Sequence, residues 1–183
     1  MKDFRSTAIG LLLTSAVLAG CQTSEVKSPS AVPESLAIPE NQTLSQRFRV
    51  HGVQIYDCKA NRDDSTRIEW TFTAPEAELR DSGGHLVGRH YAGPTWEALD
   101  GSKIVGEVVA RHDSADPNAI PWLLLRVKSA SGQGLFSRTI SVQRLDTAGG
   151  KAPAGGCDQT EVGKEARVPY VADYFFYAVK LGD

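Results

Sequence analysis

The stretch Ile68-Glu69-Trp70-Thr71-Phe72 decides the fold class, because large apolar side chains alternate in it with more polar ones. A period of two places the apolar members on one face of a half-buried strand. Similar short runs, separated by glycine, proline and aspartate, follow along the chain, and no long stretch combines helical spacing with capping signals. The chain is therefore predicted to be all-β, a single antiparallel β-sandwich or flattened β-barrel of about eight to ten strands with little helix. Later strands are expected over residues 103–111, 122–128, 135–145 and 170–180.

Glycines and aromatic residues refine this pattern. Asp81-Ser82-Gly83-Gly84 predicts a tight turn that leads into a returning strand over residues 85–90. Gly52 interrupts an alternating first strand, so we expect it to shift the phase through a β-bulge. Residues 174–177 read YFFY and are aromatic on both faces, which indicates a strand buried on both sides.

The first twenty residues have the layout of an export signal. Lys2 and Arg5 precede an apolar run over residues 8–18, and the run ends in Leu18-Ala19-Gly20-Cys21. This ending resembles bacterial lipoprotein signals, which implies that residues 1–20 are removed and that Cys21 receives a diacylglycerol and an acyl chain such as palmitate. An ordinary secretory signal, cut for instance near Ala19, is the alternative. Gln22 follows the cysteine, and the resemblance then implies an outer-membrane anchor that faces the periplasm.

The composition divides the remainder into two parts. Residues 21–36 are rich in serine and proline and are predicted to form a lipidated flexible tether, followed by one β-rich domain over residues 37–183. Removing Lys2, Arg5 and Asp3 with the signal leaves 18 basic and 21 acidic side chains, a net charge of −3. No basic cluster is present, so nucleic acid is not expected as a partner.

Two cysteines remain after lipidation. Cys58 and Cys157 form an even pair in a chain predicted to enter an oxidising compartment, so a disulfide is expected between them. Two free buried thiols and a catalytic cysteine are the alternatives. Neither cysteine lies beside a histidine and no C-x-x-C motif occurs, which argues against redox or nucleophilic use.

One glycine-punctuated segment gathers the side chains most suited to binding. Between residues 88 and 102 the chain carries five candidates for ligand binding, which are His90, Tyr91, Trp96, Glu97 and Asp100. An aromatic face beside carboxylates and an imidazole suits a sugar ring, so an envelope carbohydrate is one expected ligand. The structural alternative makes Trp96 a core residue and places Glu97 and Asp100 in solvated turns.

The same carboxylates raise the possibility of an enzyme. A hydrolase or lyase acting on envelope carbohydrate would use Glu97 and Asp100, with His90 orienting the substrate. No catalytic residue is assigned, however, because no nucleophile, phosphate-loop or metal-ligand spacing occurs in the sequence. Neither a metal nor a cofactor is expected, since His51, His85, His90 and His112 are scattered along the chain.

Two glycine-containing motifs carry a resemblance to a known family. Residues 93–97 read GPTWE and residues 149–158 read GGKAPAGGCD. With residues 53–58, 120–124 and 168–177, they resemble the domain-of-unknown-function family 3455 of exported bacterial and fungal proteins. The resemblance covers nearly the whole mature domain and implies an exported β-rich fold, but it implies no activity.

The sequence as a whole predicts a cell-envelope lipoprotein. Its membrane contact is the lipid anchor at Cys21, and its β-rich domain is expected to bind or to support another envelope component without catalysis. The ligand, an envelope glycan or a protein, is left open. The carbohydrate-cleaving enzyme is the alternative function, and a purely structural domain without a pocket is the third.

Overall fold

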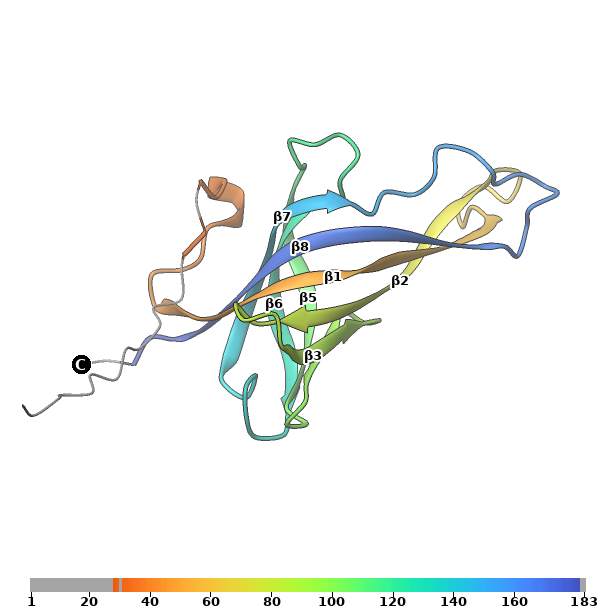
Figure 1. Ribbon diagram of the computed structural model, residues 1–183. Coiled ribbons are helices and arrows are strands. Elements are labelled where there is room, and N and C mark those ends of the chain that lie inside the picture. Colours follow the sequence, from red (N-terminus) through yellow and green to blue (C-terminus); the bar gives the residue numbers. More distant parts are fainter. Residues whose placement is uncertain (1–27, 30, 182–183) are drawn as a thin grey trace, which may run out of the picture.

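The computed structural model describes residues 28–29 and 31–181 of the chain, in which eight antiparallel strands form one closed barrel (Figure 1). Each strand pairs with the next one along the chain, and β1 pairs with β8 to close the sheet. The strands are β1 (Gln42–Ala60), β2 (Ile68–Arg80), β3 (Leu86–Tyr91), β4 (Thr95–Ala98), β5 (Lys103–His112), β6 (Trp122–Ser131), β7 (Thr139–Gly149) and β8 (Glu165–Val179). The only helix within the described part is the short 3₁₀ turn η1 (Glu34–Leu36). The predicted all-β fold is confirmed, and the barrel is the form it takes.

Three strands are much longer than the others. β1, β2 and β8 run together beyond the rest of the barrel, and the connection from β7 to β8 loops out alongside them (Figure 1). A disulfide joins Cys58 near the end of β1 to Cys157 in that connection, as predicted. No helix in the described ranges is both long and apolar enough to cross a membrane.

The barrel is filled by aromatic side chains from alternating positions. Trp96, Tyr174, Phe176 and Phe136 lie in one interior cluster, and Phe136 stacks on Phe176 with ring centroids 4.9 Å apart. β8 is buried on both faces, as its aromatic run predicts. Its other face packs Phe175 and Tyr177 into a second cluster outside the barrel.

The N-terminal segment covers this second cluster. Leu36 is fully buried there, and its carbonyl oxygen accepts a 2.6 Å hydrogen bond from the side-chain amide of Gln143. Val32 packs against the same cluster. The ordered domain therefore includes the last residues of the predicted tether, because their apolar side chains bury against the outer wall. The predicted signal peptide, Cys21 and the other predicted tether residues up to 27, together with residue 30, lie outside the described residues.

Gly52 does not shift the phase of β1, contrary to expectation. Phe48, Val50 and Gln54 are all buried, so the alternation runs through the glycine without a break. The extra residue of β1 is Ser45, between Leu44 and Gln46 in the pairing with β8, and the register change between Ile55 and Tyr56 comes from an extra residue on β2, Thr73. Gly52 is instead a close contact, since a Cβ atom at that position would collide with the backbone of β2.

Candidate functional site

A cavity of about 300 Å³ opens at one end of the barrel, which we call the mouth. The mouth carries the β3–β4 turn and the β5–β6 and β7–β8 connections, as the alternating strand directions of the barrel require. The inner wall of the cavity consists of buried side chains, and its rim consists of exposed ones. The inner wall includes Gln54, Tyr56, His90, Trp96, Leu123, Leu125, Arg144 and Tyr174, and the rim includes Phe72, Thr73, Val108 and Arg111.

The GPTWE motif builds one side of the mouth. Gly93 adopts a positive φ of 109° in the β3–β4 turn, and the amide of Gly106 on β5 donates to the carbonyl of Pro94 at 2.9 Å. Thr95 closes the turn through its hydroxyl, which donates to the carbonyl of Ala92 at 2.8 Å. Trp96 then enters the barrel as the first inward-facing residue of β4, with no exposed surface.

The GGKAPAGGCD motif supports the cavity from behind two of its lining residues, Tyr56 and Ile120. The amide of Ile120 donates to the carbonyl of Gly149 at 2.9 Å, and the hydroxyl of Tyr56 donates to the carbonyl of Gly150 at 2.7 Å. Gly150 has a φ of 84° and lies against Tyr170, where a Cβ atom would be only 2.8 Å from the tyrosine Cβ. Only glycine allows this approach. The first motif therefore lines the cavity directly, and the second holds the lining residues Tyr56 and Ile120, although 51 residues lie between the two motifs along the chain.

His90 links the turn to the core. Its ring stacks on Trp96 with centroids 4.6 Å apart, and its Nδ1 lies 2.8 Å from the carbonyl oxygen of Thr95. A carbonyl only accepts, so Nδ1 carries the proton and Nε2 is left as an acceptor in the neutral ring. Burial, with a smaller contribution from the charge of Arg144 and against the hydrogen bond to Thr95, lowers the pKa of His90 to about 3. The imidazole is therefore neutral at physiological pH.

Hydroxyl groups and one guanidinium complete the inner wall. Burial raises the pKa of Tyr174 and of Tyr56, while the positive charge of Arg144 opposes the rise in both. Burial also raises the pKa of Tyr170 well above its usual value. All three tyrosines are thus protonated hydroxyls that can donate.

The five predicted binding residues separate into three places. His90 and Trp96 both line the cavity, as inward-facing neighbours on β3 and β4. Tyr91 and Glu97 lie along a wider groove on the outer face of the barrel, where the tyrosine hydroxyl donates to Glu97 Oε2 at 2.7 Å. Asp100 lies in the β4–β5 turn, at the end of the barrel opposite the mouth.

Hydrogen bonds from neighbouring residues hold the carboxylate of Asp100. Its carboxylate accepts from the amide and the hydroxyl of Ser102 at 2.9 and 2.6 Å, and from the amide of Leu135 at 2.7 Å. These hydrogen bonds lower the pKa of Asp100 and join the β4–β5 turn to the β6–β7 connection. Glu97 and Asp100 are thus held by different partners, and neither carboxylate lines the cavity at the mouth.

Sequence reasoning missed Arg144 and Gln54, which are inward-facing polar residues on long strands. A signal was present in both cases. Arg144 shares its parity with Val142 on β7, and Gln54 shares its parity with Phe48 and Val50 on β1, so each polar residue stands at an apolar position of its strand. A polar residue in the buried phase of a strand is a better guide to an interior site than a cluster of aromatic residues in a turn.

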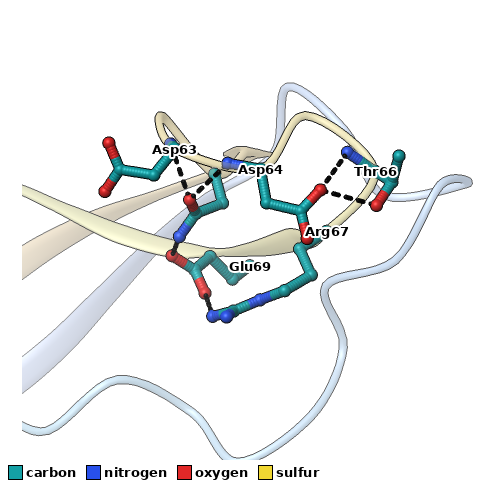
Figure 2. A network of polar contacts seen from close by, with 6 residues as sticks. Asp63, Asp64, Thr66, Arg67 and Glu69 are labelled. Atoms are coloured by element: carbon teal, nitrogen blue, oxygen red, sulfur yellow. Dashed lines mark hydrogen bonds and ion pairs between the residues drawn. The ribbon is translucent and has the colours of Figure 1, made fainter.

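The acidic residues of the β1–β2 connection provide no metal site. Figure 2 shows that Asp64 accepts from the amide and hydroxyl of Thr66, and that Glu69 accepts from Asn61 and Arg67. These carboxylates hold the loop and are already occupied. Throughout the described residues, no group of three or more histidine, cysteine or acidic side chains is arranged to hold a metal ion.

The fold and the cavity together define a class of protein, the small up-and-down β-barrel with a ligand-sized cavity at one mouth. Within that class, the chain belongs to the family described as "Protein of unknown function (DUF3455)", whose model matches residues 39–178. The match confirms the resemblance predicted from the two glycine-containing motifs. No curated protein and no solved structure matches the chain significantly.

Proposed function

We propose that this protein is a lipid-anchored envelope protein whose barrel binds a small organic molecule at the mouth, without catalysing a reaction. The observation that carries the proposal is the cavity itself, which combines a buried polar inner wall with a partly apolar rim. A barrel of eight strands is just wide enough either to fill its interior with side chains or to hold one small ligand. Here the aromatic cluster fills one part of the interior and leaves the mouth open.

Polar atoms without partners support a binding role. Gln54 Nε2 and Trp96 Nε1 are buried and have no hydrogen-bond partner among the described residues, and both residues line the cavity. Leaving such groups unpaired destabilises the folded protein by about 1 to 3 kcal/mol each. Structures tolerate that cost mainly where another molecule completes the hydrogen bonds, so these atoms favour a binding site over a purely structural barrel.

The sequence is the basis for the proposed lipid anchor and for the proposed cellular compartment. The signal layout and Cys21 predict attachment to the envelope through lipid chains, in an outer-membrane position facing the periplasm. Envelope carbohydrate remains a candidate ligand, but it would have to enter the mouth. Trp96 has no exposed face on which a sugar could stack from outside.

A substitution at the rim tests the proposal with a matched control. Val108 is 46% exposed and lines the cavity, whereas its neighbour Val109 is 51% exposed and does not. Val108→Trp should fill the mouth, and Val109→Trp should add the same side chain outside it. Each variant of the full-length chain would be screened by ligand-observed NMR against aromatic fragments with neutral, cationic and anionic side groups.

We expect some fragments to bind the wild-type chain and the Val109→Trp variant but not the Val108→Trp variant. Equal binding to both variants would place the fragments elsewhere and overturn the proposal. So would the absence of binding by every fragment to the wild-type chain.

A further inference from the structure

Arg144 is a buried charge without a charged partner. It is 8% exposed, and its Nε and one Nη donate to the carbonyl of Pro121 at 3.2 and 2.8 Å. That carbonyl has no net charge, and none of the ion pairs among the described residues includes Arg144. Buried arginines in proteins are nearly always paired with an anion.

Asp173 shows how the same fold treats its other buried charge. Its side chain is 3% exposed on the outer face of β8, and two arginines meet it there, Arg47 at 2.8 Å and Arg49 at 3.2 Å. The barrel therefore compensates a buried carboxylate with two cations, and yet it gives the guanidinium at its mouth no carboxylate.

The surroundings of Arg144 make the cavity positive. Among the described residues no aspartate or glutamate lines it, and Arg111 adds a second guanidinium at the rim. His90 is neutral and cannot cancel the charge. The protein as a whole carries a net charge of −2, so the positive cavity contrasts with the rest of the molecule.

The unpaired hydrogen-bonding groups at the mouth are mainly donors. Gln54 Nε2 and Trp96 Nε1 can only donate, and both are without a partner in the described part of the chain. The neutral Nε2 of His90 accepts, and the hydroxyls of Tyr56 and Tyr174 on the inner wall can both donate and accept. A ligand that satisfies this set must supply acceptors and negative charge, which a carboxylate does.

The remaining walls are apolar and indicate the body of the ligand. Leu123 and Leu125 line the cavity from β6, and Phe72, which is 50% exposed, lies at its rim. An apolar cavity of about 150 Å³ holds one benzene molecule. The cavity here, at about 300 Å³, has room for one ring and a short acidic side chain. An inorganic anion would leave these apolar walls unused.

From these observations we infer that the ligand of the mouth is a small organic acid, with its carboxylate paired to Arg144 and its apolar body against the β6 leucines. The inference rests on the proposed binding function and specifies the chemical class of the ligand. Neutral fragments, cations and inorganic anions are the classes that it excludes as preferred ligands.

Calorimetric titration of the full-length chain with 3-phenylpropionate and with its neutral amide, 3-phenylpropionamide, tests the inference without any mutation. The two probes have the same shape and differ in charge. We expect the acid to bind about tenfold more tightly or better, because a charge-assisted hydrogen bond replaces a neutral one. Sodium acetate and sodium phosphate in parallel titrations show whether the anion alone is sufficient.

Two variants connect the preference to the residue. Arg144→Gln removes the charge and keeps an amide that can donate to Pro121, and it should reduce binding of the acid to that of the amide. Arg126→Gln is the matched control, since Arg126 on β6 is exposed, pairs with Glu107 and does not line the cavity. If Arg144→Gln fails to fold, Arg144→Lys keeps the charge and should keep the preference for the acid.

The outcomes separate the two proposals. Equal affinity for acid and amide would overturn the organic acid and leave the binding function standing. Phosphate or acetate binding as tightly as 3-phenylpropionate would show that the anionic group alone is recognised, and it would overturn the role of the apolar body. Failure of both aromatic probes, together with no binding in the fragment screen, would refute the binding function itself.

Discussion

The buried imidazole of His90 makes the stability of the barrel decrease as the solution is acidified, in a window where few other groups titrate. In the folded state burial lowers its pKa to about 3, whereas an unfolded chain leaves a histidine near its ordinary value of about 6.5. Between these values the unfolded state binds a proton that the folded state does not. The free energy of unfolding therefore rises with pH across the window, and it decreases as the solution is acidified.

The magnitude follows from the two pKa values. Between about pH 7.5 and about pH 5, a group whose pKa is 6.5 only when unfolded reduces the free energy of unfolding by about 2 kcal/mol. The unfolded carboxylates titrate mainly below this range. The other histidines at positions 51, 85 and 112 are exposed. Urea unfolding of the full-length chain at several pH values measures the slope directly.

The control replaces the titrating group. His90→Asn places an amide nitrogen where Nδ1 donates to Thr95, and it removes the proton-binding Nε2. The variant will be less stable at every pH, because it loses the stacking on Trp96. Its stability should nevertheless change by much less between pH 7.5 and 5. If the variant has the same pH slope as the wild-type chain, the assignment of the slope to His90 is wrong.

Three further predictions concern the framework around the cavity. The Cys58–Cys157 disulfide closes a loop with a sequence separation of 99, and its removal should lower the free energy of unfolding by about 4 to 5 kcal/mol. Unfolding with and without a reductant measures the difference, and a loss under about 1 kcal/mol would contradict this prediction. Trp96→Ala should lower the free energy of unfolding by about 3 to 5 kcal/mol, whereas the exposed control Leu99→Ala should change it by no more than about 0.5 kcal/mol. Chemical unfolding measures both, and equal effects would mean that Trp96 is not a core residue. Asp100→Ala should lower the unfolding midpoint and leave fragment binding at the mouth unchanged, and a selective loss of binding would restore Asp100 as a site residue.

Local patterns predicted the fold because the strands follow a simple rule of burial. The turn at residues 81–84 and the aromatic run at residues 174–177 each depend on near neighbours, and each is confirmed. Residues 68–72 form a strand as predicted, but residues 68–71 are all half-buried and Phe72 is 50% exposed, so burial does not alternate there. The bulge was misplaced because Gly52 is required by close contact with β2, which is distant in sequence. The sequence pattern indicates a loop where the short strand β4 lies, since four residues are too few to show an alternation of apolar and polar side chains.

The site was harder to predict because closure of the barrel decides which residues meet. The sequence predicts Trp96 and His90 as binding residues of a glycine-punctuated segment, but pairing of β3 with β4 turns both side chains inward. Arg144 comes from β7 and Gln54 from β1, and only the closed sheet brings these strands to one mouth. Nothing in their local sequence shows this meeting, although each occupies an apolar position of its strand.

The most direct test of binding at the mouth is the indole N–H spectrum of the chain, titrated with 3-phenylpropionate. The sequence has three tryptophans, and the structure places Trp96 at the cavity, while Trp70 donates to Gly155 and Trp122 packs against the outer cluster. We predict that the Trp96 resonance shifts in a saturable manner and that the other two move little. A saturable shift at Trp70 or Trp122 with Trp96 unmoved, or no shift at any of the three, would contradict a ligand site in the barrel mouth.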